Sequence, residues 1–255
     1  MPQEITLGDT SLTRIGLGTN RLTNTPENVE FVQQAVAAGV GLIDTANVYS
    51  NGESEAAIGA ALSPVPEGCV VATKGGYQDG RPEALRAQIE ESLRRLRTDT
   101  IGLYYLHKVD RETPIEESLT AIAEERQRGR IRHVGVSNVS VEQLERARQV
   151  VPIAAVQNHY NLAERASDDV VDYCAANGIV FVPYFPLRSE GGRPVAEIAE
   201  RRGATPEQVA LAWLLRRSPT TVPIPGTLSI EHLRENLAAA EIDLTDAELE
   251  ALAPL

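Results

Sequence analysis

The sequence predicts an α/β fold in which eight parallel strands, each followed by a helix, close into a (β/α)8 TIM barrel. Short apolar runs recur at fairly even spacing, and each is followed by a segment with helical periodicity. The runs are apolar at consecutive positions, which is typical of strands buried on both faces. Because strands that alternate with crossover helices run parallel, the pattern indicates a parallel sheet.

The predicted strands cover most of the chain in order. Two short pieces, EITL and SLT, are separated by Gly8-Asp9 and predict an N-terminal β-hairpin that caps the bottom of the barrel. RIGLG (14–18) follows as the first barrel strand. The other seven are VGLID (40–44), CVVATK (69–74), TIGLYYLH (100–107), RHVGVSN (132–138), AAVQ (154–157), IVFVPY (179–184) and TTVPI (220–224).

The helices between the strands have ordinary start and stop signals. Pro26 opens PENVEFVQQAVAAG, with Gly39 after its last turn, and Thr205 and Pro206 open TPEQVALAWLLRR as N-cap and first helical residue. No linker or shift in composition divides the chain, so we expect a single domain over 1–255. Periodicity alone leaves a doubly wound sheet open, but GLGTNRL is not the G-x-G-x-x-G turn that such a sheet would carry.

Composition narrows the class of protein. The 255 residues are 42% hydrophobic, enough for a sizeable core, and the net charge of -12 repels phosphate backbones and anionic lipid. Neither a signal peptide nor a run of about 18 apolar residues is present. Cys69 and Cys174 fit neither a disulfide framework nor a zinc site. We therefore expect a cytoplasmic protein, monomeric or weakly oligomeric, with no metal, nucleic-acid or membrane partner.

Polar side chains stand where the predicted strands end, which in a barrel is where active sites lie. Asp44, Lys74 and His107 end three consecutive strands, and Tyr49 follows Asp44 in the next loop. Further round the mouth, the strand ends carry Ser137, Asn138, Gln157, Asn158 and Tyr184.

The first group has a common chemistry. The chain has only two lysines, Lys74 and Lys108. Lys74 ends an apolar strand and needs a counter-charge, which Asp44 can supply. A cation beside a phenol favours the phenolate, so a nearby tyrosine could exchange protons. Taken singly, Lys74 could be structural, Tyr49 could pack on the rim and His107 could be a core residue. His133, at a strand start, reads as structural, and His159 as a rim or pocket residue.

The chain resembles the aldo-keto reductase superfamily over nearly its whole length. The blocks that carry the resemblance are IGLGTN, GVGLIDTANVYSNGESEAAIGAAL, VVATKGG, LRRLRTDTIGLYYLH, GRIRHVGVSN, VQNHYNL, VALAWLL and IPGTLSIEHLREN. The most specific part is D-T-A-x-x-Y-x-x-G-x-S-E, with G-x-S-N at the proper distance.

The resemblance implies a catalytic tetrad of Asp44, Tyr49, Lys74 and His107. Tyr49 would be the general acid in reduction of an aldehyde or ketone, Lys74 paired with Asp44 would make its phenol a stronger acid, and His107 would orient the carbonyl oxygen. Donors already aimed at that oxygen would stabilise the charge it gains as hydride arrives from a reduced nicotinamide.

The resemblance also implies where the cofactor binds. Ser137, Asn138 and Gln157 would hold the carboxamide and Tyr184 would stack on the ring, while Glu235 and Asn236 would contact adenine. Gly226, Thr227 and His232 stand where the better-known branch has Lys, Ser and Arg for the 2′-phosphate, so NADP(H) is favoured and NAD(H) stays open, with Arg234 or helix N–H groups able to compensate. The full expected set is Gly18, Thr19, Asn20, Asp44, Ser137, Asn138, Gln157, Tyr184, Phe185, Leu187, Pro225, Gly226, Thr227, His232, Glu235 and Asn236.

Within the superfamily, VPYFPL, VALAWLLRRSP and IPGTLSIEHLREN are most similar to bacterial pyridoxal reductases, which implies reduction of pyridoxal to pyridoxine. The loops GGYQDGRPEA and FPLRSEGGRP are short for the family, which suggests a shallow, open site that accepts several aldehydes. An alternative is a cofactor-sensing barrel without physiological turnover. An intact tetrad favours the enzyme, because a sensor does not require Tyr49 and His107 together.

Overall fold

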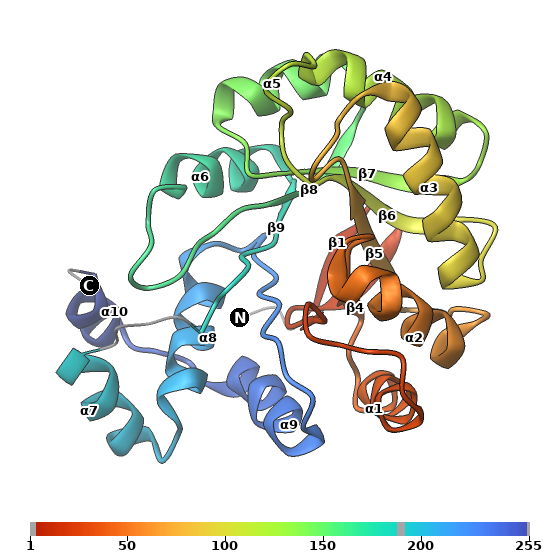
Figure 1. Cartoon of the computed structure of the whole chain (residues 1–255). Helices are drawn as coiled ribbons and strands as arrows, with labels where there is room; N and C mark the ends of the chain where they lie inside the picture. Colours follow the sequence, from red (N-terminus) through yellow and green to blue (C-terminus); the bar gives the residue numbers. More distant parts are fainter. Residues whose placement is uncertain (1–3, 188–191, 254–255) are drawn as a thin grey trace.

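The computed structural model describes residues 4–187 and 192–253. Its centre is a parallel sheet of seven strands in sequential order, β3 to β9, with helices around the outside (Figure 1). These strands are β3 (Leu17–Gly18), β4 (Leu42–Asp44), β5 (Val70–Gly75), β6 (Ile101–Leu106), β7 (Ile131–Ser137), β8 (Ile153–Gln157) and β9 (Val180–Phe181).

The predicted eighth strand, 220–224, is not a continuous strand, although it occupies the eighth place in the barrel. Val222 N donates to Phe181 O at 2.8 Å, and Gly16 N donates to Pro223 O at 2.9 Å, so this segment lies between β9 and the chain before β3. A further parallel bridge joins Gly18 to Gly226. The ladder is broken because Pro223 and Pro225 have no N–H to donate, and Pro183 shortens the predicted strand 179–184 for the same reason.

Helices connect the strands as predicted. Thr25 caps α1 through Asn28 N, and Thr205 forms a capping box with Gln208 on α8. The elements are α1 (Pro26–Ala37), η1 (Tyr49–Gly52), α2 (Glu53–Leu62), α3 (Pro82–Leu96), α4 (Ile115–Gln127), α5 (Val141–Val150), α6 (Asp168–Asn177), α7 (Gly192–Arg202), α8 (Pro206–Arg217), α9 (Ile230–Ala238), η2 (Ala239–Glu241) and α10 (Asp246–Leu252).

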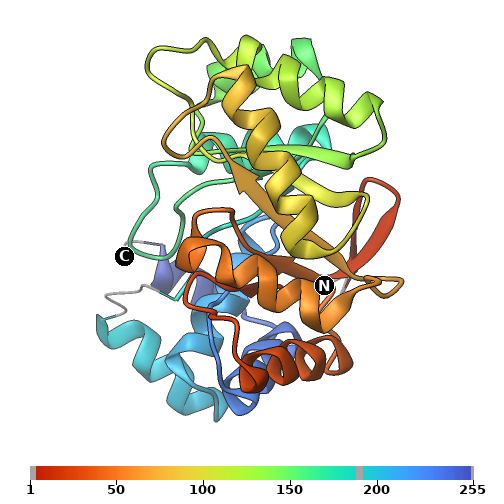
Figure 2. The ribbon, with the colours of Figure 1, turned by 45° about the vertical axis from the view of Figure 1, so that its right-hand side comes forward.

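The predicted hairpin is present as β1 (Glu4–Leu7) and β2 (Thr10–Thr13), and Figure 2 shows it in red at one end of the barrel. Leu7 and Leu12 are buried there in one apolar cluster with Leu42, Val70 and Leu103 at or near the strand starts. The hairpin therefore closes the N-terminal end of the barrel, and the other end is left for a site.

Two hydrophobic clusters fill the fold. One lies inside the barrel and includes Tyr105, whose ring occupies the space that a side chain on Gly135 would need, since a Cβ there would meet it at 2.4 Å. The other lies between the sheet and the helices. In the part of the chain described, no helix is both long and apolar enough to cross a membrane.

Candidate active site

The end of β4 and the loop after it carry Asp44 and Tyr49, and several contacts hold this loop in place. Ser54, at the start of α2, hydrogen-bonds Thr19 at 2.8 Å and Thr45 at 2.7 Å. Buried Glu55 accepts from Thr73 Oγ1 at 2.6 Å and from Arg95 Nη1 at 3.3 Å. The loop is therefore tied to β3, β5 and α3.

Glycine is required at one point of this loop. Gly52 has φ +89 and lies against Arg95, so a Cβ there would meet the guanidinium at 2.2 Å. From that position Arg95 donates to Asn47 O at 3.1 Å, two residues before Tyr49. The segment NVYSNGESE thus forms a rigid support for the Tyr49 side chain.

Lys74 is fully buried at the end of β5, and its ammonium is the centre of the site. Nζ donates to Asp44 Oδ1 at 2.6 Å, to Thr45 O at 2.7 Å and to Tyr49 OH at 3.2 Å. Gln157 Nε2 donates to the other Asp44 oxygen at 2.8 Å. The predicted counter-charge for Lys74 is therefore confirmed as a buried ion pair that also contacts a tyrosine.

Burial acts against both charges of this pair. Burial raises the pKa of the Asp44 carboxyl, while Lys74 and Gln157 oppose that rise. Burial also works to lower the pKa of Lys74, but the Asp44 carboxylate and Tyr49 outweigh it, so the pKa of Lys74 lies above its usual value. The ammonium therefore stays protonated beside the phenol across the neutral range.

His107 lies at the same mouth, directly after β6. Its ring meets the Tyr49 ring edge-on, with centroids 6.1 Å apart and an interplanar angle of 83°. Burial, with the charges of Lys74 and Lys108, lowers the pKa of His107 to about 3. Its buried Nδ1 has no hydrogen-bond partner. At neutral pH the imidazole is uncharged and has one N–H to donate.

Across the mouth, the residues expected to hold a nicotinamide are bonded to one another. Asn138, in a left-handed conformation with φ 59, donates from Nδ2 to His107 O and to Ser137 Oγ, both at 3.0 Å. Its Oδ1 accepts from Tyr184 OH at 2.9 Å. An incoming carboxamide would thus have to take the place of one of these partners.

Tyr184 presents an aromatic surface beside these amides. His159 stacks on its ring with centroids 5.2 Å apart and an interplanar angle of 10°, so one face is covered and at most one is left for a planar ligand. Phe185 packs edge-on against Tyr184. Burial raises the pKa of Tyr184, with smaller contributions from Tyr49, Tyr77 and Glu164.

The expected binding residues on the other side of the barrel form a second group. Thr19 is buried and donates to Asp44 O at 2.8 Å, so it supports the site from within. Gly18 and Gly226 face each other across the closing seam, and neither places a side chain there. Thr227, Ser229 and His232 form the turn into α9, where Ser229 caps the helix through His232 N. Asn20, Leu187, Pro225, Glu235 and Asn236 are also in the structure, which gives no direct contact from them to the tetrad.

Three residues in or beside the mouth were not expected. Tyr77, in the loop after β5, lies with its ring 4.8 Å from that of His107, and Lys108 Nζ lies 4.7 Å above the Tyr77 ring. On the seam side, Arg21 Nη2 donates to Gly226 O at 3.5 Å. The sequence signals for them were weak: Tyr77 is an aromatic residue two positions beyond the end of β5, Arg21 directly follows GTN, and Lys108 directly follows LH.

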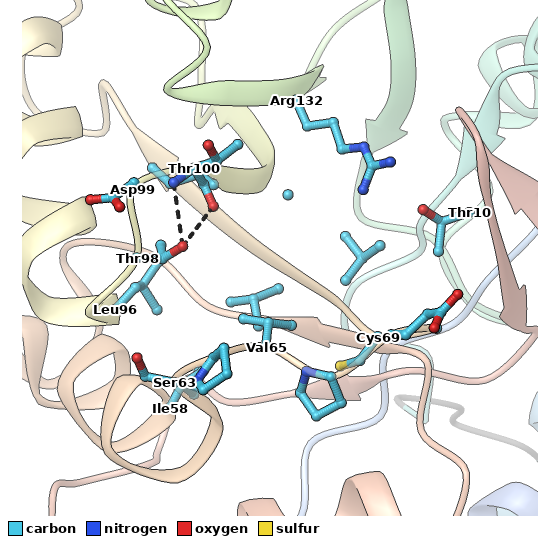
Figure 3. A pocket seen from close by; sticks show the side chains of 18 of the residues that line it. Thr10, Ile58, Ser63, Val65, Cys69, Leu96, Thr98, Asp99, Thr100 and Arg132 are labelled. Atoms are coloured by element: carbon cyan, nitrogen blue, oxygen red, sulfur yellow. Dashed lines mark hydrogen bonds between the residues drawn. The ribbon is translucent and has the colours of Figure 1, made fainter.

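A cavity of about 820 Å³ lies at the opposite, N-terminal end of the barrel (Figure 3). Two of its charged lining residues, Arg132 and Asp9, pair at 2.6 Å, and burial raises the pKa of the Cys69 thiol to about 11. None of the four converging residues lines it. Asp9 also bonds His133 Nε2 at 3.1 Å, so that histidine lies at this end of the barrel, away from the tetrad. Within 4–187 and 192–253, no three His, Cys or acidic residues group as a metal site.

With this geometry in place, comparison with known proteins gives the family. The aldo/keto reductase family model matches residues 14–194 and 190–255. This chain belongs to the aldo/keto reductase family. It is an NAD(P)H-dependent oxidoreductase acting on carbonyl groups.

Individual relatives agree. Pyridoxine 4-dehydrogenase of Escherichia coli (strain K12) is 37% identical over 277 residues, covering 97% of this chain and 96% of that protein. The crystal structure of the thermostable aldo-keto reductase Tm1743 with the inhibitor epalrestat superposes with a TM-score of 0.91 at 36% identity over 98% of both chains. An aldo/keto reductase from Klebsiella pneumoniae, crystallised with NADP and acetate, has a TM-score of 0.90 at 29% identity over 100% of this chain and 95% of that one. These structural neighbours confirm the predicted barrel class.

Proposed function

We propose that this protein transfers hydride reversibly between NADP(H) and an aldehyde or ketone, with Tyr49 as general acid and pyridoxal, reduced to pyridoxine, as a substrate. The observation that carries the proposal is the single buried ammonium of Lys74, which contacts Asp44 at 2.6 Å and Tyr49 at 3.2 Å. The pyridoxine 4-dehydrogenase relative supports the substrate, and the neighbour bound to NADP supports the cofactor.

Each residue has a distinct task in this mechanism. The reduced nicotinamide, when bound, supplies the hydride. Tyr49 gives its proton to the carbonyl oxygen, and the Lys74 ammonium stabilises the phenolate that remains. Neutral His107 donates its N–H to the same oxygen and so orients the carbonyl. Asp44 keeps Lys74 charged and aimed at Tyr49.

The cofactor would lie across the mouth between two groups of residues. Ser137, Asn138 and Gln157 would take its carboxamide, and the open face of Tyr184 would take its ring. Gly226 and His232 supply no strong cation for a 2′-phosphate. The guanidinium of Arg21 reaches the backbone of Gly226. We infer that this cation binds the 2′-phosphate in their place, so that NADPH is preferred over NADH.

The experiment is to follow NADPH, and separately NADH, by absorbance with pyridoxal and with benzaldehyde. We expect pyridoxal to be reduced with NADPH faster than with NADH. The Tyr49→Phe variant should lose about a hundredfold or more in kcat while its Kd for NADPH, measured by calorimetry, changes little.

The contrary outcomes are distinct. Turnover that survives Tyr49→Phe contradicts the general acid. Reduction of benzaldehyde but not of pyridoxal contradicts pyridoxal as the substrate and leaves the reductase activity standing. Cofactor binding without turnover of either aldehyde would favour a cofactor-sensing barrel.

A further inference from the structure

Lys108 is a cation at the site mouth that the proposed mechanism does not use. It is one of only two lysines in a chain whose net charge is -12. It is exposed, follows His107 directly, and places Nζ 4.7 Å above the ring of Tyr77. Because that ring is itself 4.8 Å from the His107 ring, the cation stands on the His107 side of the mouth.

No acidic residue neutralises this cation in the part of the chain described. Lys108 has no ion pair there, and two of the acids of the adjoining loops, Asp79 and Asp110, are bonded to other groups. Asp110 accepts backbone N–H groups of Gly80 at 2.9 Å and Glu112 at 2.8 Å, and Asp79 pairs with Arg81 at 2.6 Å. The Lys108 ammonium beside the mouth is therefore not held in an ion pair with a side chain of this region.

The charge of Lys108 is felt at the imidazole. The pKa of His107 is lowered first by burial, then by Lys74 and then by Lys108. A cation close enough to act on the imidazole is also close enough to act on a charged group of a substrate whose carbonyl meets that imidazole.

We propose that Lys108 makes this reductase selective for carbonyl substrates that carry an anionic group, a carboxylate or phosphate, away from the carbonyl. The anion would lie against the Lys108 ammonium while the carbonyl oxygen lies between Tyr49 and His107. Tyr77 positions the ammonium through the cation–π contact. This inference rests on the proposed reductase activity of the same site and refines its substrate class: pyridoxal, which carries neither a carboxylate nor a phosphate, would be reduced with a lower kcat/KM than an anionic aldehyde.

The test compares matched aldehydes with one cofactor: 4-carboxybenzaldehyde, benzaldehyde and the cationic 4-(trimethylammonio)benzaldehyde. In the wild type we expect kcat/KM to fall in that order. Lys108→Met should lower the ratio of the anionic to the neutral substrate about tenfold, chiefly through KM, and 0.5 M salt should lower it in the wild type. Lys108→Arg should restore the ratio.

Arg111→Gln is the matched control, because Arg111 is an exposed cation in the same loop with no assigned contact to the site. It should leave the ratio unchanged. If the ratio of kcat/KM for the anionic substrate to that for the neutral one is equal in the wild type and Lys108→Met, the proposal for Lys108 is overturned. The proposed reductase activity is not affected by that result.

If none of the three aldehydes turns over and pyridoxal is not reduced either, the proposed function fails and binding decides the role of Lys108. Titration calorimetry with 4-(hydroxymethyl)benzoate, the alcohol product, should then give a Kd about tenfold weaker in Lys108→Met than in the wild type. Equal Kd values overturn the proposal in that case.

Discussion

At the scale of single residues, the site depends on charges and neutral groups held out of water. The Lys74 ammonium is balanced by Asp44, whose second oxygen is satisfied by Gln157. His107 has no such balance, because both charges that affect it are positive. The Asp44 carboxylate therefore keeps Lys74 ionised against the effect of burial, while burial keeps the neighbouring His107 neutral, which is how a single mouth can hold both a proton donor and a hydrogen-bond donor.

The neutral state of His107 has a measurable effect on stability. Its pKa is about 3 in the folded protein, while an unfolded histidine titrates near pH 6.5. Below pH 6.5 the unfolded chain binds a proton at this residue that the folded chain does not, so stability is lost as pH falls toward 3. We expect about 2 kcal/mol less free energy of unfolding at pH 5 than at pH 7 from this group.

Urea denaturation of the wild type and His107→Gln at pH 7, 6 and 5 checks this. Other groups contribute equally to both proteins. The free energy of unfolding of the wild type minus that of the variant should therefore fall by about 2 kcal/mol from pH 7 to pH 5. Parallel pH profiles would mean that the histidine binds its proton over the same pH range in the folded protein as in the unfolded chain.

At the scale of elements, Arg14 connects the beginning of the barrel to its last turns. It is 2% exposed, and its guanidinium donates to Leu215 O at 2.9 Å and Ser218 O at 2.7 Å, at the end of α8. A further contact reaches Thr221 O. The negative end of the helix dipole therefore receives this buried cation in place of a carboxylate.

Arg14→Met should destabilise the protein by about 2–4 kcal/mol, because the carbonyls at the end of α8 lose their donors in a place that water does not reach. The free energy of unfolding in urea is the measurement. Arg234→Met, on the exposed side of α9, is the control and should stay within about 0.5 kcal/mol. A loss equally small for Arg14→Met would show that the carbonyls find other partners.

At the scale of the whole molecule, closure of the barrel depends on a close approach of two backbones. A Cβ on Gly18 would meet Ile224 O at 2.8 Å, whereas one on Gly226 would meet Gly18 O at 3.4 Å, an ordinary contact. The seam is thus tight on one side only, and it lies beside Thr19 and Asp44.

Gly18→Ala should therefore lower the free energy of unfolding by about 1–3 kcal/mol, since the added methyl has only backbone to push against. Gly226→Ala, on the facing side of the same seam, should cost less than 1 kcal/mol by the same principle. Thermal and urea unfolding would measure both. Equal losses in the two variants would show that the seam yields on either side.

Much of this protein could be predicted from its sequence, because periodicity and strand-end chemistry are local. The order of strands and the hairpin follow from apolar runs and turn residues, the cap at Thr205 from its place before Pro206, and the pairing of Lys74 with Asp44 from the cost of an unpaired buried cation. The prediction of a continuous eighth strand over 220–224 was wrong, because Pro223 and Pro225 have no N–H to donate to a neighbouring strand.

Only the tertiary structure decided which side chains share the mouth besides the expected ones. Tyr77, Lys108 and Arg21 lie in or beside loops, where no periodicity predicts the direction of a side chain. The mutual bonding of Asn138, Ser137 and Tyr184 likewise depends on a left-handed backbone at Asn138. The sequence by itself determined the barrel and the chemistry of its strand ends, whereas the electrostatic surroundings of His107 depend on distances between loops that fall into place only when the barrel closes.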